Sequence, residues 1–261
     1  MDSIQQILNR INTTLKSQNQ ENSQKKKNEE QKKNSYKCNL CKDTGCIIIH
    51  NEKAADTIKP CRCKEEGKIK RLWINSGIRT EDIEKTFSNF EIWNESSQNI
   101  KNVATNYYLN FEKIKESRKN SILLCGNPGS GKTHIALALA NSFMRKKGYK
   151  VIYMPYRDAI TEIKQNVLDK EQYKKIIGRY QTCEILLIDD LYKGKKTEAD
   201  LNIMFEIINY RYLNRLPCIT STELTIDEIL DYDEAIGSRI YEVSRDYLVE
   251  IKGRENNYRL R

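Results

Sequence analysis

The chain has 261 residues, of which 38% are hydrophobic and 31% are charged, and its formal net charge is +9. This length allows one full α/β domain and a smaller module, with one sizeable core that we expect in the second half. No apolar run approaches the roughly 18 residues of a membrane span, and the first residues lack a secretory pattern. We therefore expect a cytoplasmic protein with no membrane partner.

Residues 1–16 and residues 17–35 differ in apolar content. Apolar side chains recur at helical spacing in the first segment, at Ile4, Ile7, Leu8, Ile11 and Leu15. This spacing predicts a short amphipathic helix, whose apolar stripe packs either on its own chain or on a partner. Residues 17–35 contain no apolar side chain, so burial cannot offset the entropy of ordering them. We expect a flexible polar linker there.

Five of the eight cysteines lie between Cys38 and Cys63, which predicts a zinc-binding module over residues 36–70. The proposed ligands form two close pairs, Cys38 with Cys41 and Cys61 with Cys63. Two such pairs complete a closed tetrahedral site, which suits structural Zn²⁺ and leaves no open position for metal catalysis. Cys46 or His50, inside the intervening loop, could replace one ligand. A core of reduced thiols is disfavoured because the segment has too few apolar residues.

The remaining chain changes from a mainly helical connector to alternating strands and helices. Residues 71–120 form the connector and the start of a nucleotide domain, and residues 121–261 form its core. We expect strands at Ser121–Cys125, Lys150–Met154, Glu184–Ile188 and Cys218–Ser221, and helices at Lys132–Lys147, Ala159–Leu168 and Glu198–Leu213. A final region contains further helix and strand. This order predicts an α/β fold with a mostly parallel sheet covered by helices on both faces.

A glycine-rich loop lies between an expected strand and an expected helix, the context that the GxxxxGK[ST] pattern requires. Its residues are Gly126, Asn127, Pro128, Gly129, Ser130, Gly131, Lys132 and Thr133. Glycines let the backbone wrap around phosphate, and amides at the helix start present partial positive charge to it. Lys132 is expected to reach the β and γ phosphates of ATP, and the Thr133 hydroxyl to bind Mg²⁺.

A second nucleotide motif is the apolar run at residues 184–188, which ends in Asp189 and Asp190. The carboxyl edge of a parallel sheet is where ligands of such folds bind, so both carboxylates should lie near the nucleotide. We assign Asp189 to the Mg²⁺ shell and Asp190 to polarising the attacking water. The alternative is a strand that ends in an ordinary polar turn.

These motifs together resemble the DnaC/DnaI-type replicative helicase loaders and their phage relatives, a AAA+ clade that also includes the IstB transposition ATPases. The resemblance covers residue 36 to the C-terminus. It rests on the cysteine module, on the two nucleotide motifs, on Thr86-Phe87-Ser88-Asn89-Phe90 and on Gly237-Ser238-Arg239-Ile240-Tyr241-Glu242. It implies a slow, partner-stimulated ATPase with a P-loop AAA+ domain and a small zinc-binding module before it.

The resemblance also implies roles for residues outside the two motifs. Family members place a γ-phosphate sensor at the tip of the next strand, where Ser221 and Thr222 are the candidates, although many relatives have Asn there. Arg239 resembles the arginine that acts catalytically across a subunit interface, and Arg245 is a second candidate. Arg259 corresponds weakly to a second sensor.

The implied function is ATP-dependent loading of a DnaB-type hexameric helicase onto single-stranded DNA, with the N-terminal module docking on the helicase. ATP would order a homo-oligomer. The positive net charge permits nucleic-acid contact, and Tyr153, Tyr156 and Arg157 are candidates for it because aromatic rings and cations suit unstacked bases and phosphates. Two alternatives remain open: an IstB-like transposition ATPase, and a non-catalytic adaptor that binds nucleotide structurally.

Overall fold

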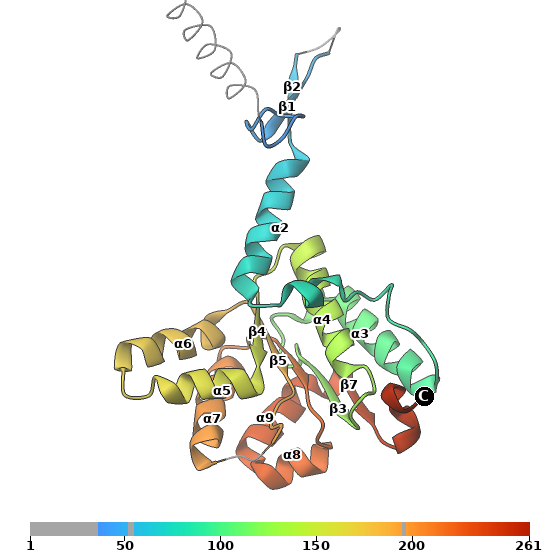
Figure 1. Cartoon of the computed structure of the whole chain (residues 1–261), viewed down its shortest axis with the longest axis vertical. Helices are drawn as coiled ribbons and strands as arrows, with labels where there is room; N and C mark the ends of the chain where they lie inside the picture. The colour runs from blue at the N-terminus through green and yellow to red at the C-terminus, as the bar shows by residue number, and fades with distance from the viewer. Residues whose placement is uncertain (1–35, 52–54, 195–196) are drawn as a thin grey trace, which may run out of the picture. The chain divides into compact units, whose positions relative to one another are not determined.

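The computed structural model describes residues 36–51, 55–194 and 197–261. The chain forms two compact units, Met1–Glu66 and Gly67–Arg261 (Figure 1). The helix expected at residues 1–16 and the linker expected at residues 17–35 lie outside the described residues. No helix within the described part of the chain is both long and apolar enough to cross a membrane.

The described part of the first unit is a cysteine turn followed by a hairpin. The backbone N–H of Lys42 donates to Cys38 O at 2.9 Å, and the carboxylate of Asp43 accepts from the backbone N–H of Cys38 at 2.9 Å. Strands β1 (Cys46–Ile49) and β2 (Thr57–Pro60) then pair antiparallel. Helix α2 (Arg62–Ser76) follows. The two strands thereby return the chain to the cysteine turn.

The second unit is built on a parallel sheet, which has five strands among its described residues. These are β3 (Ile122–Gly126), β4 (Val151–Pro155), β5 (Ile185–Asp189), β6 (Cys218–Ser221) and β7 (Leu248–Ile251). Their order in the sheet is β4-β5-β6-β3-β7, and every pair is parallel. Every residue of β3 and β5 is buried, because the sheet is covered on both faces. The predicted α/β architecture is confirmed.

The helices of this unit cover the two faces of the sheet (Figure 1). They are α3 (Glu95–Ile114), α4 (Lys132–Ser142), α5 (Tyr156–Gln165), α6 (Lys170–Thr182), α7 (Glu198–Leu213), α8 (Ile226–Tyr232) and α9 (Glu234–Ser244). Helices α3 and α4 share one apolar core with the sheet, and α5, α6, α7, α8 and α9 share the other. Short turns are η1 (Thr80–Glu84), η2 (Phe143–Lys147), η3 (Arg245–Tyr247), η4 (Arg254–Asn256) and η5 (Tyr258–Leu260).

Three helices differ from the sequence expectation. The helix expected at Ala159–Leu168 begins and ends three residues earlier, as α5. The helix expected at Lys132–Lys147 is regular only to Ser142 and ends in one π-helical turn before Gly148. Helix α6 was not expected, because few of its side chains are apolar and only Ile177 and Tyr180 are buried. Its start does carry a signal, since the Asp169 side chain caps the backbone N–H groups of the first turn.

A buried arginine connects the segments that lead into β5 and β6. Arg211, on α7, is 1% exposed. Its guanidinium donates to the backbone carbonyl oxygens of Tyr180, Gln181, Cys183 and Pro217 at 2.7 to 3.1 Å. These carbonyl dipoles stabilise the buried charge. The starts of two neighbouring strands are therefore bound to one side chain.

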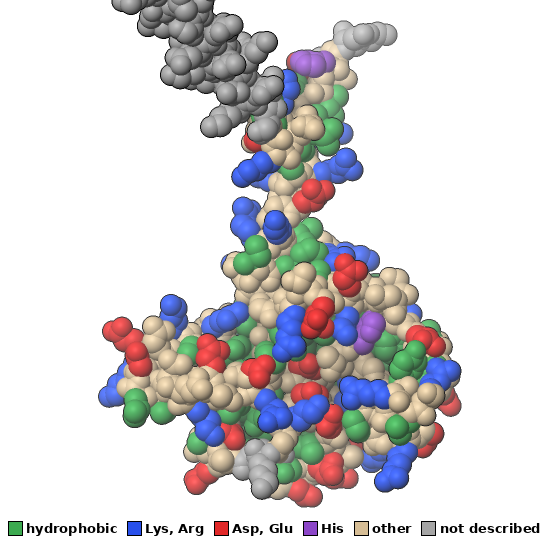
Figure 2. All heavy atoms as spheres, viewed as in Figure 1, with side chains coloured by type: hydrophobic (Ala, Val, Ile, Leu, Met, Phe, Trp, Pro, Cys, Tyr) green, Lys and Arg blue, Asp and Glu red, His purple; other side chains and the backbone are tan. Residues whose placement is uncertain are grey.

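The surface charges of this unit are mixed. On the face that Figure 2 shows, Lys and Arg side chains alternate with Asp and Glu side chains over the lower part of the molecule. The net charge of +9 therefore does not appear there as one continuous basic field, and the visible face by itself does not indicate a nucleic-acid surface.

Candidate functional site

The glycine-rich loop connects β3 to α4 in a conformation that requires glycine. Gly126, Gly129 and Gly131 all have positive φ angles, of 102°, 74° and 88°. A Cβ atom on Gly126 would overlap the backbone of Ile251 on the neighbouring strand β7. Gly131 is also the residue that precedes the first turn of α4, so the loop delivers its backbone amides to a helix N-terminus. Such an arrangement binds anions.

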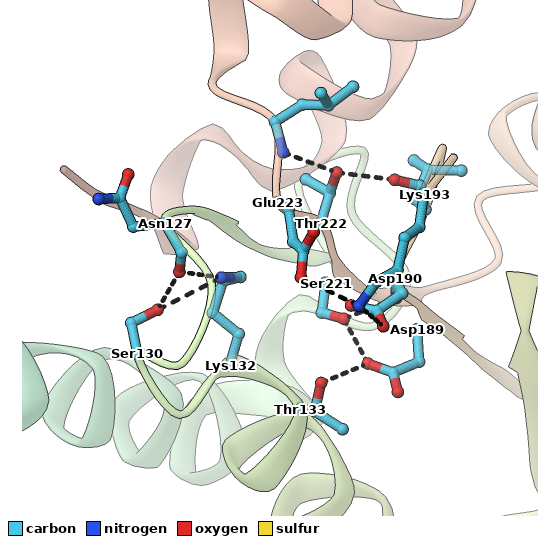
Figure 3. A network of polar contacts seen from close by, with 12 residues as sticks. Asn127, Ser130, Lys132, Thr133, Asp189, Asp190, Lys193, Ser221, Thr222 and Glu223 are labelled. Carbon is cyan, nitrogen blue, oxygen red and sulfur yellow. Dashed lines mark hydrogen bonds and ion pairs between the residues drawn. The ribbon is translucent and has the colours of Figure 1, made fainter. Parts of the chain in front are cut away.

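Lys132 lies folded into this loop (Figure 3). Its ammonium nitrogen donates to Gly126 O at 2.7 Å and to Asn127 O at 2.6 Å, and it lies 3.3 Å from Ser130 Oγ. The side chain is buried, and this desolvation lowers the pKa of Lys132 to about 8. The loop therefore surrounds a cation whose charge is costly until an anion binds.

Asp189 ends β5 opposite the start of α4 and is bound by three hydroxyl groups. Its Oδ1 accepts from Thr133 Oγ1 at 3.0 Å and from Ser221 Oγ (Figure 3). Its Oδ2 accepts from Tyr153 OH at 3.2 Å. Burial raises the pKa of Asp189, whereas the hydrogen bonds from Ser221, Thr133 and Tyr153 oppose the rise. A carboxylate beside a hydroxyl offers the hard oxygen ligands that Mg²⁺ prefers, so the residues fit this ion.

Asp190 follows Asp189 in a left-handed conformation, with φ of 56°. Its backbone N–H donates to Ser221 Oγ at 3.0 Å. Asp190 Oδ2 lies 2.8 Å from the ammonium nitrogen of Lys193, which also lies 3.0 Å from Glu223 Oε1. The sequence reasoning missed Lys193, although its position three residues after Asp190 was a signal of an ion pair.

The two sensor candidates have different surroundings. Ser221 contacts both aspartates of the acidic motif, through its own hydroxyl to Asp189 and through the Asp190 N–H. Thr222 is buried, and its hydroxyl donates to Leu191 O at 2.8 Å and accepts from Leu224 N–H. Ser221 thus lies against Asp189 and Asp190, whereas the Thr222 hydroxyl bonds to the backbone of Leu191 and Leu224. Their sensing role remains a prediction.

Residues 128–133 of the glycine-rich loop, Asp189, Asp190 and Lys193 line one cavity of about 530 Å³, a size suited to a nucleotide. Beyond the phosphate loop the wall is aromatic, formed by Phe90, Trp93 and Tyr258, with Glu91 and Arg259 beside them. Trp93 and Tyr258 make an edge contact with centroids 6.0 Å apart, and Tyr258 OH donates to Glu91 at 2.6 Å. The aromatic wall was missed because neither nucleotide motif includes its residues, and because Tyr258 is distant in sequence from Phe90 and Trp93.

The two arginine-finger candidates lie outside the residues that line this cavity. Arg239, on α9, donates to Ala235 O at 2.6 Å and to Asn209 Oδ1 at 3.2 Å, and its guanidinium packs over the Phe205 ring at 5.2 Å. Arg245 lies 4.0 Å from Asp246. Either arginine would therefore act on a nucleotide held by a second copy of the chain, and this role remains a prediction.

The three candidates for nucleic-acid contact also differ in their burial and contacts. Tyr156 is buried, with 4% of its surface exposed, so it is a core residue and the expectation of contact was wrong for it. Tyr153 donates a hydrogen bond to Asp189. Arg157 is exposed and remains available to an anionic partner.

In the first unit, the sulfur atoms of Cys38, Cys41, Cys61 and Cys63 lie within 4.8 Å of one another. Two of the Sγ–Sγ distances are 3.7 Å and 3.4 Å. Four ligands about 2.3 Å from one tetrahedral ion stand roughly 3.8 Å apart, so this donor set fits Zn²⁺. Cys46 and His50 are not part of the group, and His50 Nδ1 instead lies 2.8 Å from an oxygen of Asp56.

Comparison with known proteins gives close relatives. The phage-like element PBSX protein XkdC of Bacillus subtilis (strain 168) is 40% identical over 235 residues, covering 86% of this chain and 86% of that protein. The uncharacterized protein YqaM of the same strain is 44% identical over 204 residues. That match covers 75% of this chain, which spans only 64% of YqaM.

Comparisons with solved structures and with protein families identify the fold and the family of the chain. A crystal structure of the DnaC helicase loader matches with a TM-score of 0.58 at 24% identity, over 67% of this chain and 100% of that one, a likeness of fold alone. Residues 68–261 match the model of the IstB-like ATP binding proteins, and this range contains the glycine-rich loop and the acidic strand end. Because the match covers most of the chain, the protein belongs to the IstB-like ATP binding family of AAA+ ATPases.

Proposed function

We propose that the chain binds ATP with Mg²⁺ in the 530 Å³ cavity and hydrolyses it to ADP and phosphate. The observation that carries this proposal is the convergence of Lys132, Thr133, Asp189 and Asp190, from two separate motifs, on one cavity. The loop amides and Lys132 would bind the β and γ phosphates. Thr133 and Asp189 would hold Mg²⁺, whose positive charge would offset the negative charge of the phosphates.

Within this arrangement Asp190 would orient and polarise the attacking water. Its carboxylate lines the cavity next to Asp189, but it pairs with the ammonium group of Lys193, whereas Asp189 accepts from hydroxyl groups. Two neighbouring carboxylates with different partners can serve different roles, one at the metal and one at the nucleophile. Ser221, which contacts both, would keep them apart and could report the presence of the terminal phosphate.

The Asp190→Asn variant separates binding from hydrolysis. We expect its affinity for ATP not to fall, because the phosphate loop and the magnesium ligands remain. Hydrolysis should fall at least tenfold, since the amide cannot accept a proton from water. Steady-state phosphate release and equilibrium binding measure the two effects. Hydrolysis at the wild-type rate would remove Asp190 from this role.

For the physiological client we propose a DnaB-type replicative helicase, loaded onto single-stranded DNA in the cytoplasm. The structural likeness to a protein described as a helicase loader supports the proposal, as does the four-cysteine module before the ATPase domain. In this scheme the N-terminal module, including residues 1–35, docks on the helicase. ATP binding would join copies of the chain through Arg239, and hydrolysis would release them.

A pull-down of the host helicase by the full-length chain tests the client. We expect retention of the helicase when ATP is present, and loss of retention when the four proposed zinc ligands are replaced by Ser. The match to the IstB-like family favours a second candidate, delivery of target DNA to a transposase. Retention of a transposase and not of the helicase would select that candidate. Absence of ATPase activity with and without single-stranded DNA would favour a non-catalytic adaptor.

A further inference from the structure

Lys193 lines the proposed nucleotide cavity, although it belongs to neither of the two nucleotide motifs. It lines the cavity together with Lys132 and Thr133, and its side chain is 38% exposed. Its ammonium nitrogen bridges Asp190 and Glu223 at 2.8 Å and 3.0 Å (Figure 3). A second cation thus faces the space next to the phosphate loop.

The backbone that positions Lys193 has an unusual conformation. Tyr192, immediately before it, has a φ of 62°, a conformation that bulky residues rarely adopt. Burial holds Tyr192 in place, together with ring contacts to Tyr156 and Tyr232 at 5.7 Å and 6.0 Å between centroids. The Lys193 N–H then donates to Asp190 O at 3.0 Å, which closes a turn. Backbone strain held by packing is typical of functional segments.

The electrostatics of the cavity connect Lys193 with the phosphate loop. Burial is the largest cause that lowers the pKa of Lys132, and the positive charge of Lys193 lowers it further. The carboxylates of Glu223 and Asp190 act in the opposite direction. The two ammonium groups therefore interact across the cavity. A terminal phosphate bound between them would carry more negative charge than either carboxylate and would compete for Lys193.

We propose that Lys193 senses the γ-phosphate of ATP by exchanging its ion pairs with Asp190 and Glu223 for a contact with that phosphate. The exchange favours triphosphate over diphosphate, because only the triphosphate reaches Lys193. It also releases the Asp190 carboxylate, which then becomes available to the attacking water. This inference rests on the proposed ATPase function and adds a residue that distinguishes ATP from ADP.

The Lys193→Met variant keeps the aliphatic stem and removes the charge. With Mg²⁺, its affinity for a non-hydrolysable ATP analogue should fall about tenfold, while its affinity for ADP changes less than twofold. Isothermal titration calorimetry measures both. The matched control is Lys119→Met, since Lys119 is 40% exposed and lies 3.1 Å from Asp246 outside the cavity. This control should bind both nucleotides as the wild type does.

Two further variants test how the charge of Lys193 and its ion pair with Glu223 affect the preference for ATP over ADP. Lys193→Arg retains the charge and should restore most of the ATP preference. Glu223→Gln frees Lys193 from one ion pair and should raise the ATP preference severalfold. An unchanged ratio of ATP to ADP affinity in Lys193→Met and Glu223→Gln would overturn the inference, whether or not both affinities fall. If the wild-type chain binds neither nucleotide, the proposed function fails instead.

Discussion

Replacing Lys132 with Ala is expected to lower the affinity for ATP at least a hundredfold. Hydrogen bonds between charged groups contribute about 1.5–3 kcal/mol each, and the Lys132 ammonium would make such bonds with two phosphates in a buried loop. Fluorescence titration with a labelled ATP analogue measures the change. An affinity within threefold of wild type would show that the nucleotide does not occupy the glycine-rich loop.

The same substitution should leave folding stability unchanged or higher. A lysine whose pKa is lowered by folding costs stability at every pH at which the unfolded chain keeps it protonated. The pKa of Lys132 falls to about 8, so at neutral pH the charged side chain opposes folding. Thermal unfolding of Lys132→Ala without nucleotide measures whether the stability is unchanged or higher. Intact stability with lost binding excludes misfolding as the cause.

The pKa of Lys132 also predicts how ATP binding depends on pH. Below about pH 8 the free protein already carries the charge, and above it binding must take up a proton. Affinity should therefore fall above pH 8, approaching tenfold per pH unit. Lys193 should not contribute in this range, since its ion pairs with Asp190 and Glu223 outweigh burial and raise its pKa. Lys132→Arg stays charged and should show a flat profile from pH 8 to 10.

Removing the metal should unfold the described part of the first unit. Within residues 36–51 and 55–66, only Cys41 and Cys61 are buried, so no apolar core supports the hairpin. Zinc bound by four thiolates contributes on the order of 10 kcal/mol to the folding of such modules. We expect one zinc per chain by elemental analysis, and loss of amide protection in β1 and β2 after chelation. Protection should persist in the sheet of the second unit.

Serine variants distinguish the ligands from their neighbours. Cys61→Ser should abolish zinc binding, because this thiol is fully buried within the sulfur cluster. Cys46→Ser and His50→Ala are matched controls from the same hairpin region and should retain the metal. Equal loss of zinc in Cys46→Ser would assign that thiol to the site. A chain that retains its amide protection without zinc would contradict the whole assignment.

The succession of strands and helices along the chain could be predicted because its causes are local. Buried parallel strands appear as continuous apolar runs, and the helix predicted at Glu198–Leu213 agrees with α7 residue for residue. Helix α6 was not predicted because most of its side chains are polar and give no clear helical period of apolar residues. The order of strands within the sheet could not be predicted in this way, because pairing depends on contacts between segments that are distant in sequence.

The phosphate loop could be located because its glycines and lysine are contiguous. Tyr153 could not, because its contact with Asp189 depends on the pairing of β4 with β5. The role of Glu223 depends similarly on the turn that presents Lys193. Sequence motifs thus identify the residues expected to contact phosphate, whereas the groups that orient them arise from packing between strands.

The guanidinium of Arg211 has a consequence for the end of the sheet that carries Asp189 and Ser221. It holds the chain just before β5 and just before β6, so both strands run from one anchor toward Asp189 and Ser221. A slip of one residue in either strand would turn that side chain to the opposite face. A lysine cannot bind so many carbonyl groups at once. Alignment of the Asp189 carboxylate with its serine partner is therefore secured at the opposite edge of the sheet, remote from the proposed nucleotide site.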